Sequence, residues 1–209
     1  MEEKRDQNRR LVTECALELF LEKGVDNVTI REVAERSGLT ERSVYRYFYT
    51  RADLVLATSF LFWDGIKAEV EKVVSDSSYR GMKGIEQIKI MLRFYSSLFL
   101  ESPKSVRYIL GAEMSLKNSG VTIDIKDRPP GRYEDSDTPL AHAIKAGIAD
   151  GSVSPDVDHE EIYYMLYDAI LGTMQRMALG ATTKEDTEHV KKRMEHLCSM
   201  FIAAFEGKI

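Results

Sequence analysis

The sequence predicts an all-α protein, with a small N-terminal three-helix domain over residues 1–52 and a larger helical domain over residues 53–209. Apolar residues recur at spacings of three and four along most of the chain, which is the pattern of amphipathic helices. The 209 residues include only 5 prolines, so long helices can form without interruption. Strand-like alternation is scarce, and we expect its clearest example, residues 121–125, to form a loop.

The composition is that of a soluble globular protein, with 44% hydrophobic and 30% charged residues. The 29 basic and 34 acidic residues give a net charge of −5, which argues against a protein that coats nucleic acid with a uniformly basic surface. No segment approaches 18 uninterrupted apolar residues, so we expect no membrane span. Cys15 and Cys198 lie at helical intervals among apolar residues, which favours two buried free thiols and a reducing cytoplasm.

The first predicted helix runs from about Arg5 to Lys23 and ends before Gly24, a favourable residue just beyond a helix C-terminus. Five apolar residues at helical spacing give it one buried stripe. These residues are Leu11, Cys15, Ala16, Leu19 and Phe20.

Two short helices and one long helix follow. Thr29 and Glu32 have the spacing of a capping box, which starts a helix that stops at Ser37-Gly38. Thr40 is the expected N-cap of the next helix, whose apolar face is Val44 and Phe48. The capping pattern recurs at 50–53 and starts a fourth helix, which we expect to continue to about residue 74.

The rest of the chain predicts longer and more apolar helices, separated by one long loop over residues 119–137 that we expect to be weakly ordered. Pro103 and Pro155 stand where they would begin or precede helices rather than break them. The expected helices cover residues 82–101, 103–118, 138–150, 158–180 and 184–206.

The two short helices joined by residues 37–40 have the spacing of a helix-turn-helix. Gly38 permits the sharp reversal because glycine adopts a positive φ without strain. The second helix then exposes arginines, which can bind the guanine edge in bidentate fashion, and a glutamate, which can accept from cytosine N4. From Thr29 to Arg51 there are five arginines and three glutamates, 5 − 3 = +2, a modest local excess.

Residues from about 9 to 54 resemble the DNA-binding domain of TetR-type transcriptional regulators. The stretch 38–48, Gly-Leu-Thr-Glu-Arg-Ser-Val-Tyr-Arg-Tyr-Phe, and the stretch 50–54, Thr-Arg-Ala-Asp-Leu, match the family's turn and recognition helix. The stretch 29–34 matches the preceding helix. The resemblance covers roughly a quarter of the chain and implies a three-helix DNA reader. It also implies a helical domain that dimerises and binds a small effector.

The resemblance further implies which side chains contact DNA, by their positions in the matching stretches. The candidates for base contacts are Arg31, Thr40, Glu41, Arg42 and Arg46. The candidates for phosphate contacts, which fix the register of a protein on the duplex, are Thr29, Ser43, Tyr45, Tyr47 and Arg51. The family commonly has histidine at the Arg46 position and lysine at the Arg51 position.

Two apolar groups in the larger domain could serve an effector and a second copy of the chain. The candidate lining of a mostly apolar effector cavity is Trp63, Met91, Phe94, Tyr95, Phe99 and Tyr108. The helix over 158–180 is apolar nearly all round and must be buried nearly all round, which a dimeric four-helix interface with the last helix would achieve. The candidate interface residues are Tyr163, Leu166, Ile170, Met174, Leu197 and Phe201; burial within one chain is the alternative.

No pattern indicates catalysis, a cofactor or a metal. The acidic residues near Asp158 are better explained as an N-cap and a favourable first turn than as metal ligands. The sequence therefore predicts a cytoplasmic, sequence-specific DNA-binding regulator, a ligand-responsive homodimeric repressor of a palindromic operator. Its expected partners are double-stranded DNA, a second copy and a small, mostly apolar effector, with no membrane. A helix-turn-helix regulator without an effector and an all-helical enzyme are the alternatives.

Overall fold

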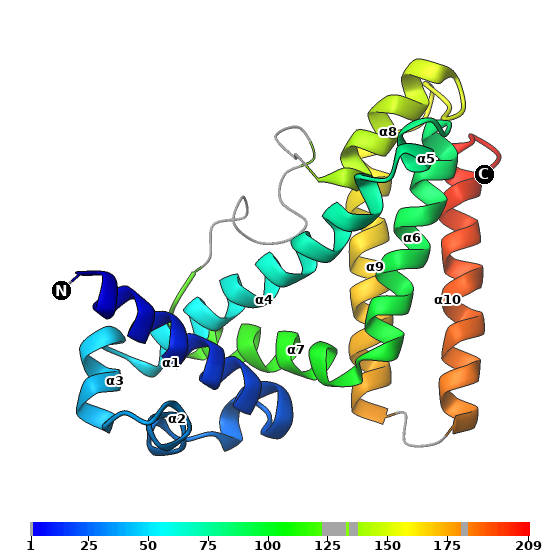
Figure 1. The fold of residues 1–209 in the computed structure, drawn as a ribbon. Helices are drawn as coiled ribbons and strands as arrows, with labels where there is room; N and C mark the ends of the chain where they lie inside the picture. Colours follow the sequence, from blue (N-terminus) through cyan, green and yellow to red (C-terminus); the bar gives the residue numbers. More distant parts are fainter. Residues whose placement is uncertain (1, 123–132, 134–137, 181–183) are drawn as a thin grey trace. The chain divides into compact units, whose positions relative to one another are not determined.

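The computed structural model describes residues 2–122, 133, 138–180 and 184–209, and for residues 2, 98, 99 and 184–187 it describes the backbone only. The described residues form α-helices and one short 3-10 helix, and no strand occurs among them (Figure 1). The predicted all-α class is confirmed. The chain divides into two compact units, one of residues 1–68 and 104–122, the other of residues 69–103 and 123–209.

Unit 1 gathers the N-terminal helices together with one helix from later in the chain. Its elements are α1 (Glu2–Lys23), η1 (Val25–Asn27), α2 (Ile30–Ser37), α3 (Glu41–Tyr47), the first part of α4 (Arg51–Val74) and α7 (Pro103–Asn118). The helix α1 begins three residues before the expected start at Arg5, and η1 was not predicted.

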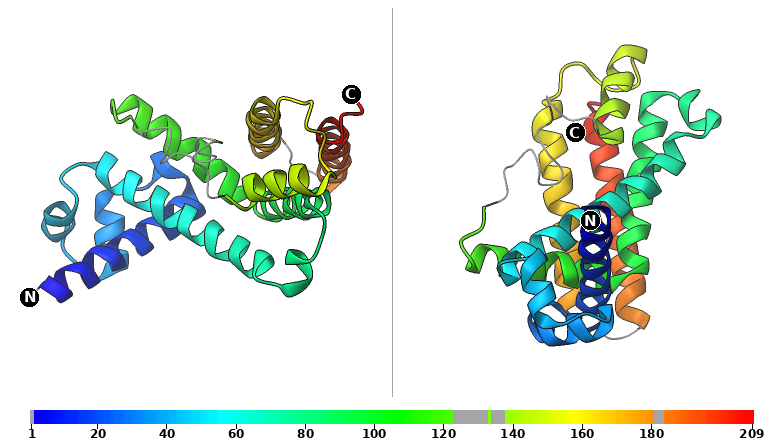
Figure 2. Two further views of the ribbon diagram at one scale, coloured as in Figure 1. Left: turned by 90° about the horizontal axis from the view of Figure 1, so that it is seen from above. Right: turned by 60° about the vertical axis from the view of Figure 1, so that its left-hand side comes forward.

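The core of unit 1 forms where α1 packs against α2 and α3 (Figure 2). Cys15, Ala16, Leu19 and Phe20 are buried as expected, but Leu11 is 40% exposed. Its neighbour Val12 is fully buried instead, because the buried face of α1 follows positions 12, 15, 16, 19 and 20.

The helix α7 packs in unit 1, although the sequence assigned it to the larger domain. The Tyr108 ring lies 6.5 Å from that of Phe20 and 5.2 Å from that of Phe62, and its hydroxyl donates to Thr58 Oγ1 at 2.9 Å. A Cβ at Gly111 would lie 3.4 Å from a methyl group of Val25. Contacts across 46 or more positions in sequence therefore decide which unit holds α7, and no local sequence pattern indicates them. The functional boundary expected at residue 52 stays a prediction.

Unit 2 contains the end of α4 and five further helices. They are α5 (Ser77–Arg80), α6 (Gly84–Glu101), α8 (Pro139–Asp150), α9 (His159–Gly180) and α10 (Lys184–Phe205). The short helix α5 was not predicted, and its N-cap is Asp76, which accepts from the Ser78 backbone N–H at 2.7 Å. The cap of α9 is as predicted, since Asp158 Oδ1 accepts from the Glu161 N–H at 3.0 Å.

The helices α6 and α8 make the most extensive contact in unit 2. A Cβ at Gly84 would lie only 2.2 Å from the Gly147 Cα, so the two backbones can approach this closely only because Gly84 lacks a side chain. The start of α6 is capped from the other helix: the Gly84 N–H donates to Asp150 Oδ2 at 2.7 Å, and the Ile85 N–H donates to Ser152 Oγ at 3.1 Å.

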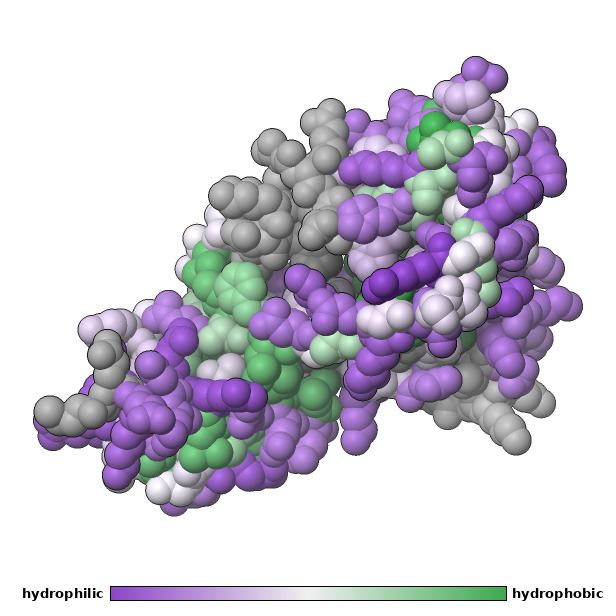
Figure 3. Space-filling model, turned by 45° about the horizontal axis from the view of Figure 1, so that its top comes forward, coloured by the Kyte–Doolittle hydropathy of each residue, from purple (hydrophilic) through white to green (hydrophobic). Residues whose placement is uncertain are grey.

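No helix in the described part of the chain is long and apolar enough to cross a membrane. The face drawn in Figure 3 is mostly hydrophilic, with hydrophobic patches between hydrophilic residues. Cys15 and Cys198 are buried free thiols, as the sequence predicted.

Candidate nucleic-acid interface

The turn between α2 and α3 is built as the sequence predicted. Gly38 ends α2 in the left-handed conformation, with φ of 67°, and its N–H donates to the carbonyl oxygens of Ala34 and Glu35. The Leu39 N–H also donates to the Ala34 carbonyl at 2.9 Å, which closes the turn. This geometry fixes the direction in which α3 leaves α2.

The helix α3 has one buried face and one exposed face. Val44 and Phe48 are 0% and 2% exposed and hold the helix on the core of unit 1. The expected base-contact residues Glu41, Arg42 and Arg46 are exposed together with Tyr45. Because the exposed positions are spaced by three and four, their side chains project from the same side of the helix.

The first turn of α3 uses two expected DNA contacts as capping groups. Thr40 Oγ1 accepts from the Ser43 backbone N–H at 3.2 Å and lies 3.0 Å from Ser43 Oγ, with which it shares a hydrogen bond. Each hydroxyl can still form further hydrogen bonds, since a hydroxyl has one donor and two acceptor sites.

Tyr47, at the end of α3, is held by two donors. Asn8 Nδ2 of α1 donates to its hydroxyl at 3.2 Å, and Arg46 Nη2 donates to it at 3.1 Å. The bonds from Asn8 and then from Arg46 lower the pKa of the Tyr47 hydroxyl below its usual value. The hydroxyl hydrogen is left to donate, so Tyr47 is positioned to give a hydrogen bond to an anion. Sequence reasoning missed Asn8, because its partner lies 39 positions away.

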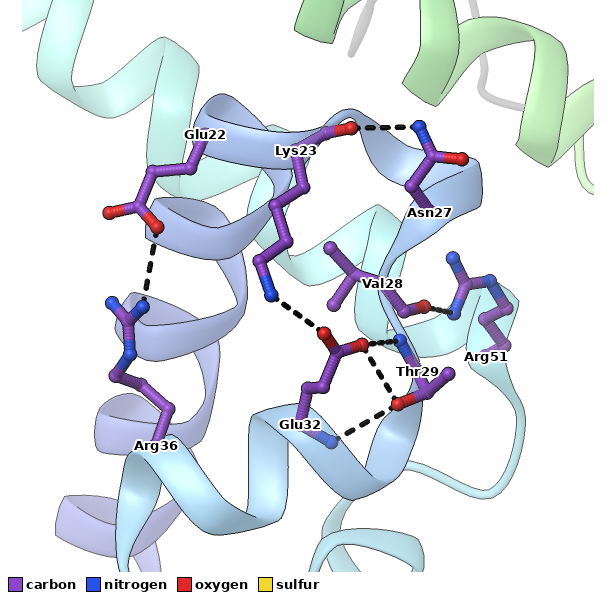
Figure 4. A network of polar contacts seen from close by, with 8 residues as sticks. All are labelled: Glu22, Lys23, Asn27, Val28, Thr29, Glu32, Arg36 and Arg51. Carbon is purple, nitrogen blue, oxygen red and sulfur yellow. Dashed lines mark hydrogen bonds and ion pairs between the residues drawn. The ribbon is translucent and has the colours of Figure 1, made fainter.

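The start of α2 is fixed by the predicted capping box (Figure 4). Thr29 Oγ1 accepts from the Glu32 N–H at 3.2 Å, and the Thr29 N–H donates to Glu32 Oε2 at 2.7 Å. Lys23 Nζ donates to Glu32 Oε1 at 2.7 Å, and this bond, followed by those from Thr29, lowers the pKa of Glu32 to about 2. The Thr29 hydroxyl also donates to Glu32, so its role here is to cap α2.

Arg31 and Arg51 both have partners within unit 1. Arg31 Nε lies 2.9 Å from Glu35 Oε1, in an exposed pair that contributes little and is easily exchanged for another anion. Arg51 Nη1 donates to the Val28 carbonyl at 2.6 Å, and its Nη2 donates to that of Val25. The half-buried Arg51 guanidinium therefore joins the start of α4 to the segment between α1 and α2 (Figure 4).

Tyr49 is a further exposed side chain that sequence reasoning missed. It follows the buried Phe48 in the segment between α3 and α4 and is 87% exposed. Tyr49 does not fit the apolar spacing of α3, and this mismatch was the sequence signal that could have indicated its exposure.

The N-terminal part of the chain matches a known family. Residues 12–58 match the family model for bacterial regulatory proteins of the tetR family. The N-terminal segment is therefore similar to the N-terminal domain of tetR-family regulatory proteins. The expected three-helix DNA-binding domain is confirmed, and the matched segment includes the turn, α3 and the start of α4.

The fold of most of the chain is also shared with solved structures, some of which are described as TetR-family regulators. A protein described in connection with the control of antibiotic production by bacterial hormones matches with a TM-score of 0.67 and 19% identity, over 95% of this chain and 97% of its own. RolR in complex with resorcinol matches with a TM-score of 0.61 and 17% sequence identity, over 98% of this chain and 95% of its own. Thermus thermophilus FadR, a TetR-family repressor in complex with lauroyl-CoA, matches with a TM-score of 0.58 and 16% sequence identity, over 91% of this chain and 93% of its own. Among curated proteins, none matches the chain.

The residues expected to line an effector cavity are divided between the two units of the chain. Trp63 and Tyr108 belong to unit 1, where Tyr108 is 1% exposed and part of the core. Met91, Phe94 and Tyr95 belong to unit 2, where Tyr95 lies 5.8 Å from Phe94 between ring centroids. The Phe99 side chain lies outside the described residues. The cavity itself stays a prediction.

Four residues expected at a dimer interface lie in the core of unit 2. Tyr163, Leu166, Ile170 and Met174 are 0–3% exposed, because they form the face of α9 that packs inside the unit. They therefore offer no surface to a second copy. Leu197 and Phe201 of α10 are half-buried. The exposed apolar residues on the same two helices are Met165, Leu179 and Met200.

Proposed function

We propose that this chain is a sequence-specific transcription regulator that places α3 in the major groove of DNA. The observation that carries the proposal is the exposed face of α3, with Arg42 and Arg46 projecting from a helix whose other face is anchored by Val44 and Phe48. A rigid helix with exposed arginines fits the major groove, where arginine distinguishes guanine from the other bases.

The proposed contacts separate into base readout and phosphate anchoring. For base readout we propose Arg31, Thr40, Glu41, Arg42 and Arg46. For phosphate anchoring we propose Ser43, Tyr45, Tyr47, Thr29 and Arg51. Tyr47 has the strongest support, because its hydroxyl is already oriented by Asn8 and Arg46. Thr29 and Arg51 would contact phosphate only while keeping their bonds within unit 1.

We further propose a homodimer that reads a palindromic operator. Two half-sites about one helical turn apart, roughly 34–36 Å, match a two-fold axis between two copies of α3. The proposed contact uses the exposed side of α9 and α10, where Met165 and Leu179 are 53% and 72% exposed and Met200 is 59% exposed. Met165, Gly172 and Leu179 are spaced by seven residues, so they follow one face of α9.

As a repressor working in the cytoplasm, the dimer would release its operator when a small, mostly apolar effector binds the C-terminal helices. Two similar folds that bind resorcinol and lauroyl-CoA support this proposal. An effector shifts the equilibrium only if it binds the released form more tightly than the DNA-bound form.

The test begins with selection of bound duplexes from a random pool, which gives the operator. An Arg42→Ala variant should then lose discrimination at one base pair in each half-site, at a cost of about 1–3 kcal/mol for the preferred base. Arg93→Ala, which removes an exposed arginine of α6, is the matched control and should leave the base preference unchanged. If Arg42→Ala weakens binding to every duplex by the same factor, Arg42 does not read a base.

A further inference from the structure

A pocket of about 260 Å³ lies within unit 2, between the end of α4, the short helix α5, and the helices α6 and α8. None of its lining residues belongs to the set expected to form an apolar effector cavity. The lining residues are Val74, Tyr79, Arg80, Gln87, Pro139 and His142.

Tyr79, one of the lining residues, carries an unusual hydroxyl group. The residue is 6% exposed, and its hydroxyl is the buried side-chain oxygen that has no hydrogen-bond partner among the described residues. A buried polar group without a partner is costly, and native proteins pair nearly all such groups. Elsewhere among the described residues, buried hydroxyls are paired: that of Tyr108 bonds to Thr58, and that of Ser96 bonds to the Leu92 carbonyl. The missing partner at Tyr79 therefore indicates a group that the described part of the chain does not supply.

Burial raises the pKa of Tyr79 to about 12, so the hydroxyl keeps its hydrogen at neutral pH. A protonated phenol can donate to an anionic oxygen. Charge-assisted hydrogen bonds of this kind are stronger than neutral ones.

Arg80, the next residue, brings a cation to the same pocket. Its Nε donates to the Val74 carbonyl at 3.3 Å, which orients the guanidinium. Its two terminal nitrogens have no ion pair or hydrogen bond within the described part of the chain. They are thus available for a carboxylate or phosphate, which a guanidinium binds in bidentate fashion.

The remaining lining residues give the pocket a fixed shape. Gln87 Nε2 donates to the carbonyl oxygens of Tyr79 at 3.2 Å and of Met82 at 3.1 Å, so α6 holds the end of α5 in place. Val74 and Pro139 supply apolar surface beside the polar groups. A pocket with apolar walls and a few oriented polar groups is typical of small-molecule sites.

We propose that this pocket binds a small organic anion, with its carboxylate or phosphate on Arg80 and Tyr79 and a short apolar body against Val74 and Pro139. The proposal stands apart from DNA binding, because every residue that carries it belongs to unit 2. It also differs from the mostly apolar effector cavity, since here a charged group provides the recognition.

The test measures binding to the full chain, without DNA, by titration calorimetry and by the shift in Tm. The probes are benzoate, 3-methylbutyrate and phenyl phosphate, with the neutral counterparts benzamide, 3-methylbutyramide and phenol. At least one anion should bind, and its neutral counterpart should bind at least about tenfold more weakly. Arg80→Gln should weaken the anion at least about tenfold. The matched control Arg93→Gln should leave its affinity unchanged.

Two outcomes of this titration would overturn the proposal: no anion binds at millimolar concentration, or Arg80→Gln binds as tightly as the parent chain. Because no DNA is present, neither outcome bears on the proposed regulator function.

A second pair of variants tests the Tyr79 hydroxyl directly. Tyr79→Phe should weaken the anion severalfold while the ligand-free Tm stays the same or rises, because no internal hydrogen bond is lost. Tyr108→Phe, which loses a bond to Thr58, should lower the ligand-free Tm and serves as the comparison. If Tyr79→Phe lowers the Tm as much as Tyr108→Phe does, the hydroxyl has a structural partner and the proposal falls.

Discussion

Arg51 has a structural role in unit 1 and a proposed role as a phosphate contact. The sequence suggests a phosphate contact, whereas the folded chain uses the guanidinium to bind the carbonyl oxygens of Val25 and Val28. The ring of Phe20 lies beneath it, with the guanidinium carbon 5.7 Å from the ring centroid. A guanidinium has five donors, so both tasks are compatible only if the remaining donors reach the DNA.

Two substitutions at Arg51 separate these tasks. Arg51→Lys keeps the charge but cannot bridge two carbonyl oxygens with a planar fork, so it should destabilise unit 1 by about 1–3 kcal/mol and preserve the salt dependence of DNA binding. Arg51→Ala should lose similar stability and also flatten the salt dependence if Arg51 contacts phosphate. Trp63, the one tryptophan of the chain, lies in unit 1 and reports unfolding by its fluorescence. If the salt dependence of DNA binding is unchanged in Arg51→Ala, Arg51 stabilises the fold and does not contact phosphate.

Glu32 gives unit 1 a pH-dependent part of its stability. Its folded-state pKa of about 2 lies below the ordinary value near 4.5, because Lys23 and Thr29 bond to the carboxylate. The contribution is therefore complete above the ordinary pKa and is lost as the pH falls toward 2. Glu32→Gln should lower the urea midpoint at pH 7 and flatten its change between pH 5 and pH 3, read from Trp63 fluorescence. A pH profile parallel to that of the parent chain would contradict this assignment.

At the level of elements, the start of α6 depends on a second helix. A Cβ at Gly84 would lie 2.0 Å from the Gly147 N and 2.6 Å from the Ala143 carbonyl oxygen, so α6 and α8 could not keep their spacing. Gly84→Ala should therefore destabilise unit 2 by at least about 2 kcal/mol, measured by calorimetry and far-UV circular dichroism. Gly65→Ala is the control, because this glycine of α4 has open space and alanine favours a helix. Equal stability of the two variants would show that the helices can separate at no cost.

The elements that the sequence predicts well are those whose signals are local. The capping box of Thr29 and Glu32, the positive φ of Gly38 and the N-cap at Thr40 involve residues within a few positions of each other. The α6 cap from Asp150 and the bond from Asn8 to Tyr47 join residues 66 and 39 positions apart, so no local pattern reports them.

The same limit applies to α9 and to the candidate site. Tyr163 and Leu166 are apolar residues at helical spacing, but periodicity cannot say whether such residues pack in the chain's own core or against a second copy. The positions of Arg42 and Arg46 could be predicted from the family pattern, whereas the orientation of Tyr47 required the neighbouring helix.

At the scale of the whole molecule, one chain offers one α3, and a palindromic operator requires two. Since the inward face of α9 is occupied within unit 2, the proposed dimer would use the outward face. Scattered apolar residues are normal on protein surfaces, but Met165, Leu179 and Met200 gather on two helices that contact each other. Covering such a surface is the common reason for symmetric pairing.

The double variant Met165→Glu, Met200→Glu tests this pairing. Both side chains are more than half exposed, so the chain should keep its helical circular dichroism, while two buried carboxylates per copy should prevent the dimer from forming. Light scattering after size exclusion should then show one chain instead of two, and affinity for a two-half-site operator should fall toward that for one half-site. Met114→Glu, at a methionine of α7 that is 49% exposed, should remain dimeric. A double variant that still elutes as two chains and binds the full operator would place the contact elsewhere, since unpaired charges buried at the centre of an interface are strongly destabilising.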